Sequence, residues 1–99
     1  MKYRVIAGDN DVEIRDYYVE ILQEKGIEVF TAETGKELLR KYKETFADLV
    51  IMDTLDSVTN RTLKYGEVIN ILRQMNPDVK ILFISGLLLT RKNLRNVTK

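Results

Sequence analysis

Short apolar runs alternate with amphipathic segments along this chain. Four runs, at residues 5–7, 27–31, 49–52 and 81–84, have the length of β-strands. The second run alternates apolar and polar residues, as an edge strand does, whereas the others are unbroken, which is typical of strands buried on both faces. The pattern therefore predicts four strands of a largely buried sheet.

Helical segments separate these strands. The apolar residues at helical spacing are Ile14, Tyr18, Ile21 and Leu22 in the first segment, Leu38, Leu39, Tyr42 and Phe46 in the second, and Val68, Ile69, Leu72 and Met75 in the third. Asp11 and Thr34 are in position to cap the first two helices, Thr34 as part of a capping box. Gly26 and Pro77 follow the first and third helices as stop signals. Repeated strand–helix units predict an α/β fold with a doubly wound parallel sheet.

Two parts of the chain do not fit this alternation. The stretch from residue 54 to 65 is long for a connection in such a fold, and we interpret it as a lid or a flexible insert. Residues 87–99 are compatible with a helix beginning near Thr90, a short strand around Val97, or a frayed tail. All 99 residues are expected to form one domain, because the chain is too short for two cores.

The composition excludes several functions. With 44% hydrophobic and 31% charged residues, the chain has the composition of a globular protein, and without cysteine or histidine it lacks the usual thiolate nucleophile and proton shuttle. No apolar run is long enough for a membrane span and no leader pattern is present, so we expect a cytoplasmic protein without a membrane partner. The net charge of +1 does not favour nucleic acid. The basic residues after position 79 are interpreted as a solvated terminal segment.

Polar residues with metal-binding and nucleophilic chemistry follow three of the predicted strands. They are Asp9 and Asn10 after the first, Asp53 at the end of the third, and Ser85 after the fourth. Parallel sheets bind ligands beyond the carboxyl ends of their strands. Two carboxylates near a carboxamide suit Mg²⁺ or Mn²⁺, and a carboxylate beside such a cation is a credible nucleophile toward a phosphoryl group. The alternative is that these residues cap helices or face solvent.

Three segments together resemble a known family. The sequences VIAGDNDVEIR at positions 5–15, DLVIMD at 48–53 and NPDVKILFISG at 76–86 are similar to the opening, the phosphoacceptor strand and the switch strand of response-regulator receiver domains. These domains have the flavodoxin-like, CheY-like fold. The resemblance covers residues 3–86, and the three motifs occur in the family's order.

The resemblance implies a role for individual residues. Asp53 matches the phosphoacceptor, Asp9 and Asn10 match the acidic pair that holds Mg²⁺, and the backbone carbonyl of Leu55 matches a further metal ligand. Ser85 matches the hydroxyl that turns toward the phosphoryl group. A histidine kinase and a downstream protein are the implied partners.

The chain also departs from the family. Asn10 replaces the usual second acid, which predicts weaker metal binding, and Ser57 stands where the family usually has proline. The chain ends where a complete receiver has its fifth βα unit, so we expect that unit to be missing or incomplete. Lys99 resembles the family's phosphoryl-contacting lysine in local sequence only, and a solvated terminal lysine is the alternative. An exposed strand at residues 81–84 would favour self-association, such as a homodimer through the sheet edge.

Three functions therefore compete. The first is a receiver that takes a phosphoryl group on Asp53, with no enzymatic activity beyond this autocatalytic transfer. Leu55 and Leu87 would then shield the adduct from water and slow its loss. The second is an unphosphorylated pseudo-receiver that binds a protein partner. The third is a haloacid-dehalogenase-like phosphatase, which is disfavoured because Leu55 stands where that family has its second aspartate.

Overall fold

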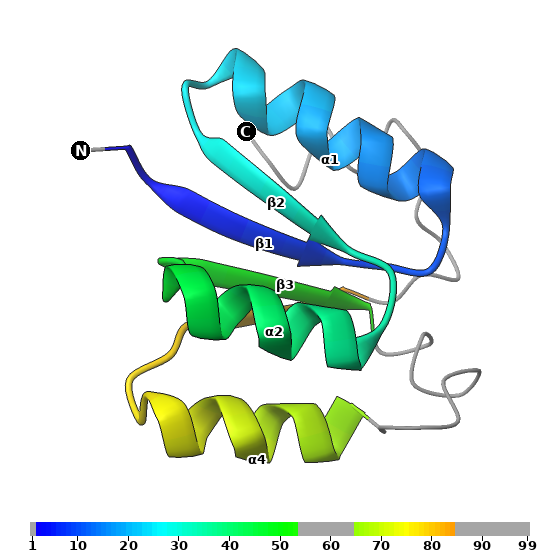
Figure 1. Ribbon diagram of the computed structural model, residues 1–99. Helices are drawn as coiled ribbons and strands as arrows, with labels where there is room; N and C mark the ends of the chain where they lie inside the picture. Colours follow the sequence, from blue (N-terminus) through cyan, green and yellow to red (C-terminus); the bar gives the residue numbers. More distant parts are fainter. Residues whose placement is uncertain (1, 54–64, 85–99) are drawn as a thin grey trace.

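A sheet of four parallel strands forms the centre of the protein (Figure 1). The computed structural model describes residues 2–53 and 65–84. The strands are β1 (Arg4–Gly8), β2 (Glu28–Ala32), β3 (Leu49–Asp53) and β4 (Ile81–Ile84), in the spatial order β2-β1-β3-β4. The chain builds outward from β1 first on one side and then on the other. This is the strand order expected of a doubly wound sheet.

Helices cover both faces of this sheet. Helix α1 (Val12–Glu24) lies on one face, and helices α2 (Gly35–Thr45) and α4 (Tyr65–Met75) lie side by side on the other (Figure 1). Both faces of the central strands are therefore buried, which explains their unbroken apolar sequences. The predicted fold class is confirmed. Two predictions concern residues outside the described ranges. The long stretch after Asp53 falls on residues 54–64, and the fifth βα unit with Lys99 falls on residues 85–99.

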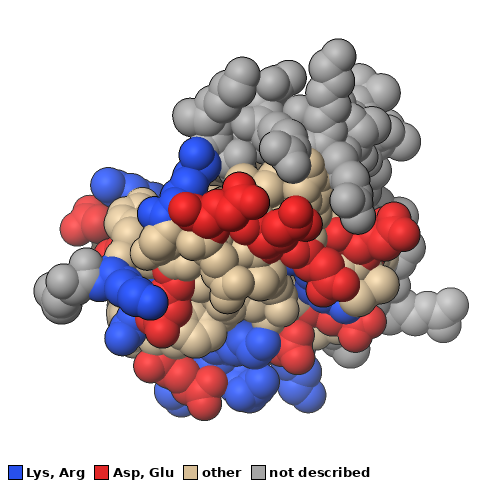
Figure 2. Space-filling view, turned by 90° about the horizontal axis from the view of Figure 1, so that it is seen from above, with Lys and Arg blue, Asp and Glu red and all other residues tan. Residues whose placement is uncertain are grey.

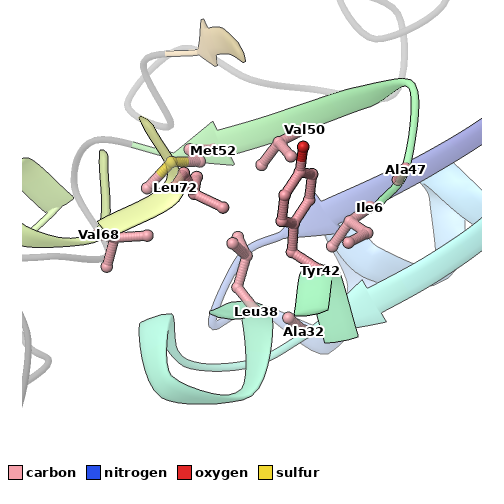
Figure 3. Close-up of a cluster of buried hydrophobic side chains, with 9 residues drawn as sticks. All are labelled: Ile6, Ala32, Leu38, Tyr42, Ala47, Val50, Met52, Val68 and Leu72. Atoms are coloured by element: carbon pink, nitrogen blue, oxygen red, sulfur yellow. The ribbon is translucent and has the colours of Figure 1, made fainter. Parts of the chain in front are cut away.

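Each face of the sheet has its own apolar core. On the α1 face, buried side chains of the helix pack against alternate residues of the sheet. The buried members are Val5, Ala7, Tyr17, Tyr18, Ile21, Leu22, Ile51 and Ile84. The opposite core contains Ile6, Ala32, Leu38, Tyr42, Ala47, Val50, Met52, Val68 and Leu72, with the Tyr42 ring at its centre (Figure 3).

The first two helices begin at the predicted caps. The Asp11 side chain accepts a hydrogen bond from the Glu13 N–H at 2.9 Å, and the Thr34 hydroxyl accepts one from the Glu37 N–H at 3.1 Å. The Glu37 carboxylate accepts from the Glu33 N–H at 2.7 Å, one residue earlier than in the standard capping box. The bonds from Glu13 and Glu37 satisfy N–H groups that the first helical turn leaves without partners.

Phe46 was expected on the apolar face of the second helix, and this prediction is wrong. The helix ends at Thr45, and Phe46 caps it in the left-handed conformation with φ 46°. Its N–H donates to the Tyr42 carbonyl at 2.7 Å, its ring lies 5.1 Å from the Tyr42 ring, and 52% of its surface is exposed. Because glycine usually occupies such a position, no residue of the sequence indicated that the helix would stop here.

The outward face of α1 is acidic. Glu13, Asp16, Glu20 and Glu24 are all exposed and recur at intervals of three or four residues. Figure 2, which looks onto this side of the molecule, shows acidic side chains gathered there. No helix within the described ranges is long and apolar enough to span a bilayer.

Candidate functional site

The register of β1 and β3 brings the two predicted acids to the same level of the sheet. Gly8 is the register partner of Met52. Asp9 follows Gly8 at the end of β1, and Asp53 follows Met52 as the last residue of β3. Neighbouring strands lie about 4.8 Å apart, so the two backbones are adjacent at the carboxyl edge of the sheet. Asp53 is also the register partner of Ile84, so β4 ends at the same edge.

Asp9 is a buried acid held by its neighbours. Only 2% of its surface is exposed. Its N–H donates to the carbonyl of Ala32 on β2 at 3.0 Å, and its Oδ1 accepts from the Asp11 N–H at 2.9 Å. These two bonds hold Asp9 in position at the end of β1. The bond to Oδ1 also offsets part of the cost of burying the carboxylate.

Arg15 also contacts Asp9, which was not predicted from the sequence. One guanidinium nitrogen, Nη1, donates to the Asp9 carbonyl oxygen at 2.7 Å in a partly buried setting. The signal available in the sequence was a cation in the first turns of a helix that follows two acids. The spacing alone does not specify this contact, because a long arginine side chain has many alternatives at the surface.

The donor set fits a hard divalent cation. Asp9 supplies a buried carboxylate, and Asn10 follows it as an exposed carboxamide. With Asp53 at the same level, all these side-chain donors are oxygens, which Mg²⁺ and Mn²⁺ prefer. Within the described ranges no three Asp, Glu, His or Cys residues gather as a metal site.

Other predicted site residues cannot be placed. Leu55, whose carbonyl was the predicted metal ligand, and Ser85, the predicted switch hydroxyl, lie outside the described residues, as does Leu87. Their roles remain predictions.

A hollow of about 650 Å³ lies at the opposite end of the sheet. Three of the residues that line it are bonded to one another: the Arg4 Nε donates to Glu28 Oε1 at 3.0 Å, and the Arg4 backbone N–H donates to Asp48 Oδ2 at 2.8 Å. These pairs join the starts of β1, β2 and β3. We therefore interpret this region as a structural clamp, separate from the acidic edge.

Comparison with known proteins identifies the fold's relatives. No family model matches the sequence, and no curated protein matches it. Among solved structures, response regulator TrrA of Thermotoga maritima, in complex with Mg²⁺ and BeF, is 33% identical, with a TM-score of 0.74, and the match covers 99% of this chain and 81% of TrrA. TrrA has also been solved in complex with the histidine kinase ThkA.

More distant structures share the same fold. The CheY-like receiver domain of Methanospirillum hungatei is 23% identical with a TM-score of 0.77, and the match covers 98% of this chain and 74% of that domain. The chemotaxis response regulator CheY4 of Vibrio cholerae is 24% identical with a TM-score of 0.76, over 99% of this chain and 81% of that one.

These similarities define the class of protein. The parallel sheet, the acids at its carboxyl edge and the identity to TrrA agree with the resemblance of the three sequence motifs. The chain belongs to the CheY-like response-regulator receiver domains, the family of two-component signalling.

Proposed function

We propose that this domain receives a phosphoryl group on Asp53 from a histidine kinase, in a reaction that depends on Mg²⁺ or Mn²⁺. The observation that carries this proposal is the register of β1 and β3, which brings Asp53 level with the buried Asp9. The presence of Mg²⁺ in one TrrA structure and of a histidine kinase in another supports it by family relationship.

In the proposed transfer, an Asp53 carboxylate oxygen attacks the phosphorus of a phosphohistidine. The P–N bond breaks as the P–O bond forms, and the released imidazole nitrogen takes up a proton. A bound divalent cation would offset negative charge on the transferring oxygens. Asp9, Asn10 and Asp53 would hold that cation, together with the Leu55 carbonyl. Ser85 would contact the phosphoryl group and convey its presence to a downstream protein.

The product is a stoichiometric adduct, so the domain would be no enzyme beyond this self-phosphorylation. The cytoplasmic location expected from the sequence, and the absence of nucleic-acid and membrane partners, remain predictions. So does a homodimer through β4. Among the described strands β4 is at one edge, and its Leu82 and Phe83 are 39% and 40% exposed.

Intact-mass spectrometry tests the proposal. The protein is incubated with Mg²⁺ and acetyl phosphate beside Asp53→Asn, with Asp78→Asn as a matched change at an exposed turn. We expect one phosphoryl group on the wild type and on Asp78→Asn, and none on Asp53→Asn or after chelation of the metal. An adduct that persists in Asp53→Asn would assign the acceptor to another residue.

A pseudo-receiver is the second candidate, and Asn10 is the observation that favours it. An amide in place of an acid keeps an oxygen ligand but removes a negative charge from the cation site. If a folded wild-type protein forms no adduct, the domain acts as a binding module without phosphorylation. Turnover of a phosphate ester would instead support the phosphatase alternative.

A further inference from the structure

We infer that Arg15 is a positioning residue for the cation site, acting through the backbone that links Asp9 to Asn10. This inference rests on the proposed function, since it assigns a role toward the cation that Asp9 and Asn10 would hold. The observation that carries it is the 2.7 Å hydrogen bond from Arg15 Nη1 to the Asp9 carbonyl oxygen.

The bonded oxygen belongs to the peptide group between the two proposed ligands. A peptide group is planar, so fixing its oxygen fixes the direction in which the chain continues to Asn10. Asn10 lies beyond the last paired residue of β1, which is Gly8, and it is exposed. Strand pairing of β1 ends at Gly8, and the guanidinium of Arg15 gives this peptide a fixed contact beyond the strand.

Two other polar atoms of Asp9 bond to main-chain groups. Its N–H is paired with Ala32 of β2, and its Oδ1 is paired with the N–H of Asp11. These are bonds to main chain, which any side chain at the partner position would preserve. The bond to the Asp9 carbonyl is different because it depends on the identity of residue 15. A donor with a full charge in a partly buried setting also makes a stronger bond than a neutral one.

Helix α1 gives Arg15 a rigid base. The Arg15 N–H donates to the Asp11 carbonyl at 3.0 Å in the first turn, and Asp11 is the N-cap of the helix. Backbone and side chain of Arg15 thus bind two points of the loop that carries the proposed ligands. The loop is therefore held at Asp9 and at Asp11, on either side of Asn10.

Arg15 could alternatively act by its charge alone, and the two roles predict opposite effects. A guanidinium near a cation site repels a divalent ion, so its removal should strengthen binding if charge is all that matters. If Arg15 orients the ligands, its removal should weaken binding despite the lost repulsion. The sign of the change therefore distinguishes the two roles.

The test is a Mg²⁺ titration of Arg15→Met, Arg15→Lys and Arg40→Met, followed by amide NMR shifts. Arg40→Met is the matched control, because it removes the same charge from an exposed i,i+4 ion pair with Glu44 on α2. We expect Arg15→Met to raise the Kd for Mg²⁺ about 10-fold, the usual effect of losing a residue that orients metal ligands. Arg15→Lys should recover part of the affinity, and Arg40→Met should bind as the wild type does.

A second measurement needs no metal and separates positioning from general loosening of the fold. In EDTA, the Asp11 amide should exchange with solvent faster in Arg15→Met, because its acceptor on Asp9 is less well held. The amide of Leu22, on the same helix, should exchange as in the wild type. Equal acceleration at both amides would show a merely structural role and overturn the inference.

The outcomes also separate this inference from the proposed function. If the wild type binds Mg²⁺ and accepts a phosphoryl group, but Arg15→Met binds Mg²⁺ equally or more tightly, the inference alone is wrong. If the folded wild type binds no Mg²⁺, the metal-dependent function is wrong and the inference is overturned with it.

Discussion

The side-chain amide of Asn76 donates a hydrogen bond of 3.0 Å to the hydroxyl of Tyr42. Tyr42 is fully buried between α2 and the sheet. The two residues are 34 positions apart. Asn76 follows the last turn of α4, where its N–H donates to the Leu72 carbonyl and its side-chain oxygen accepts from the Asp78 N–H. The bond thus connects the end of α4 to α2 across the core (Figure 3 shows Tyr42 in that core).

Removal of either partner of this bond should destabilise the domain, by different amounts. Tyr42→Phe loses one hydrogen bond, which predicts a loss of about 0.5–1.5 kcal/mol in the free energy of unfolding. Asn76→Ala leaves the buried Tyr42 hydroxyl unpaired and also removes the bond to Asp78, so we expect a loss of about 1–3 kcal/mol. Urea denaturation measures both. Tyr3→Phe, at a residue that is 45% exposed, is the control and should change nothing.

Gly8→Ala should destabilise the domain through a clash with Leu38. A β-carbon at Gly8 would lie 2.8 Å from the Leu38 Cδ1, and Leu38 is buried. Overpacking of this kind costs about 1–3 kcal/mol. Leu38→Val shortens the clashing side chain, so the double variant should lose less stability than the two single losses added together. Strict additivity would contradict the clash.

Gly66→Ala is the matched control for this substitution. Gly66 lies near the start of α4, with nothing within 4 Å of the added carbon. Alanine has the higher helix propensity, so stability should stay equal or rise by no more than about 1 kcal/mol.

Glu24→Lys should stabilise the domain. Glu24 ends α1, whose last turn has no basic residue, and it follows Glu20 by four positions. The substitution replaces a repulsive pair with an attractive one and puts a positive charge at the negative end of the helix dipole. Together these effects predict a gain of about 0.5–1 kcal/mol in the free energy of unfolding at low salt. Thermal denaturation should show a smaller gain in 1 M NaCl, because the Debye length there is only about 3 Å and surface charges are screened from one another. A gain that is independent of salt would exclude an electrostatic origin.

Asn10→Asp should strengthen binding of Mg²⁺, because it adds a carboxylate beside Asp9. Without metal the same change should lower stability, since another acid then lies near Asp9 without a compensating cation. Thermal unfolding with and without Mg²⁺ checks both effects, and the difference between the two conditions should be larger than in the wild type. If Mg²⁺ shifts both proteins equally, residue 10 is not a ligand.

The sequence predicted the elements well because the short apolar runs of the strands and the helical spacing of apolar residues were both clear. The run at residues 81–84 matches β4, and Asp11 and Thr34 are the observed N-caps. The second strand begins one residue later than predicted, because the Ile27 N–H bonds to the Leu22 carbonyl and so belongs to the end of α1. The prediction for Phe46 was wrong because a residue other than glycine in the left-handed conformation has no local sequence signature.

For the candidate site, the sequence predicted that Asp9 and Asp53 lie at the same edge of the sheet, but not the bonds that hold Asp9. Asp9 and Asp53 lie at the same edge because the ends of parallel strands always do. The Arg15 contact depends on where a flexible side chain finds a carbonyl oxygen, which no periodicity encodes. The functional roles of Asp9, Asn10 and Asp53 remain predictions.

The pairing of Gly8 with Met52 has a further consequence for folding. A slip of one residue between β1 and β3 would move Asp53 away from the level of Asp9 and turn the side chains of one strand to the wrong face of the sheet. A cation that binds both acids would bind only molecules with the native register. Such a cation would therefore stabilise only correctly paired sheets, so that the native strand register and metal binding would depend on the same two residues.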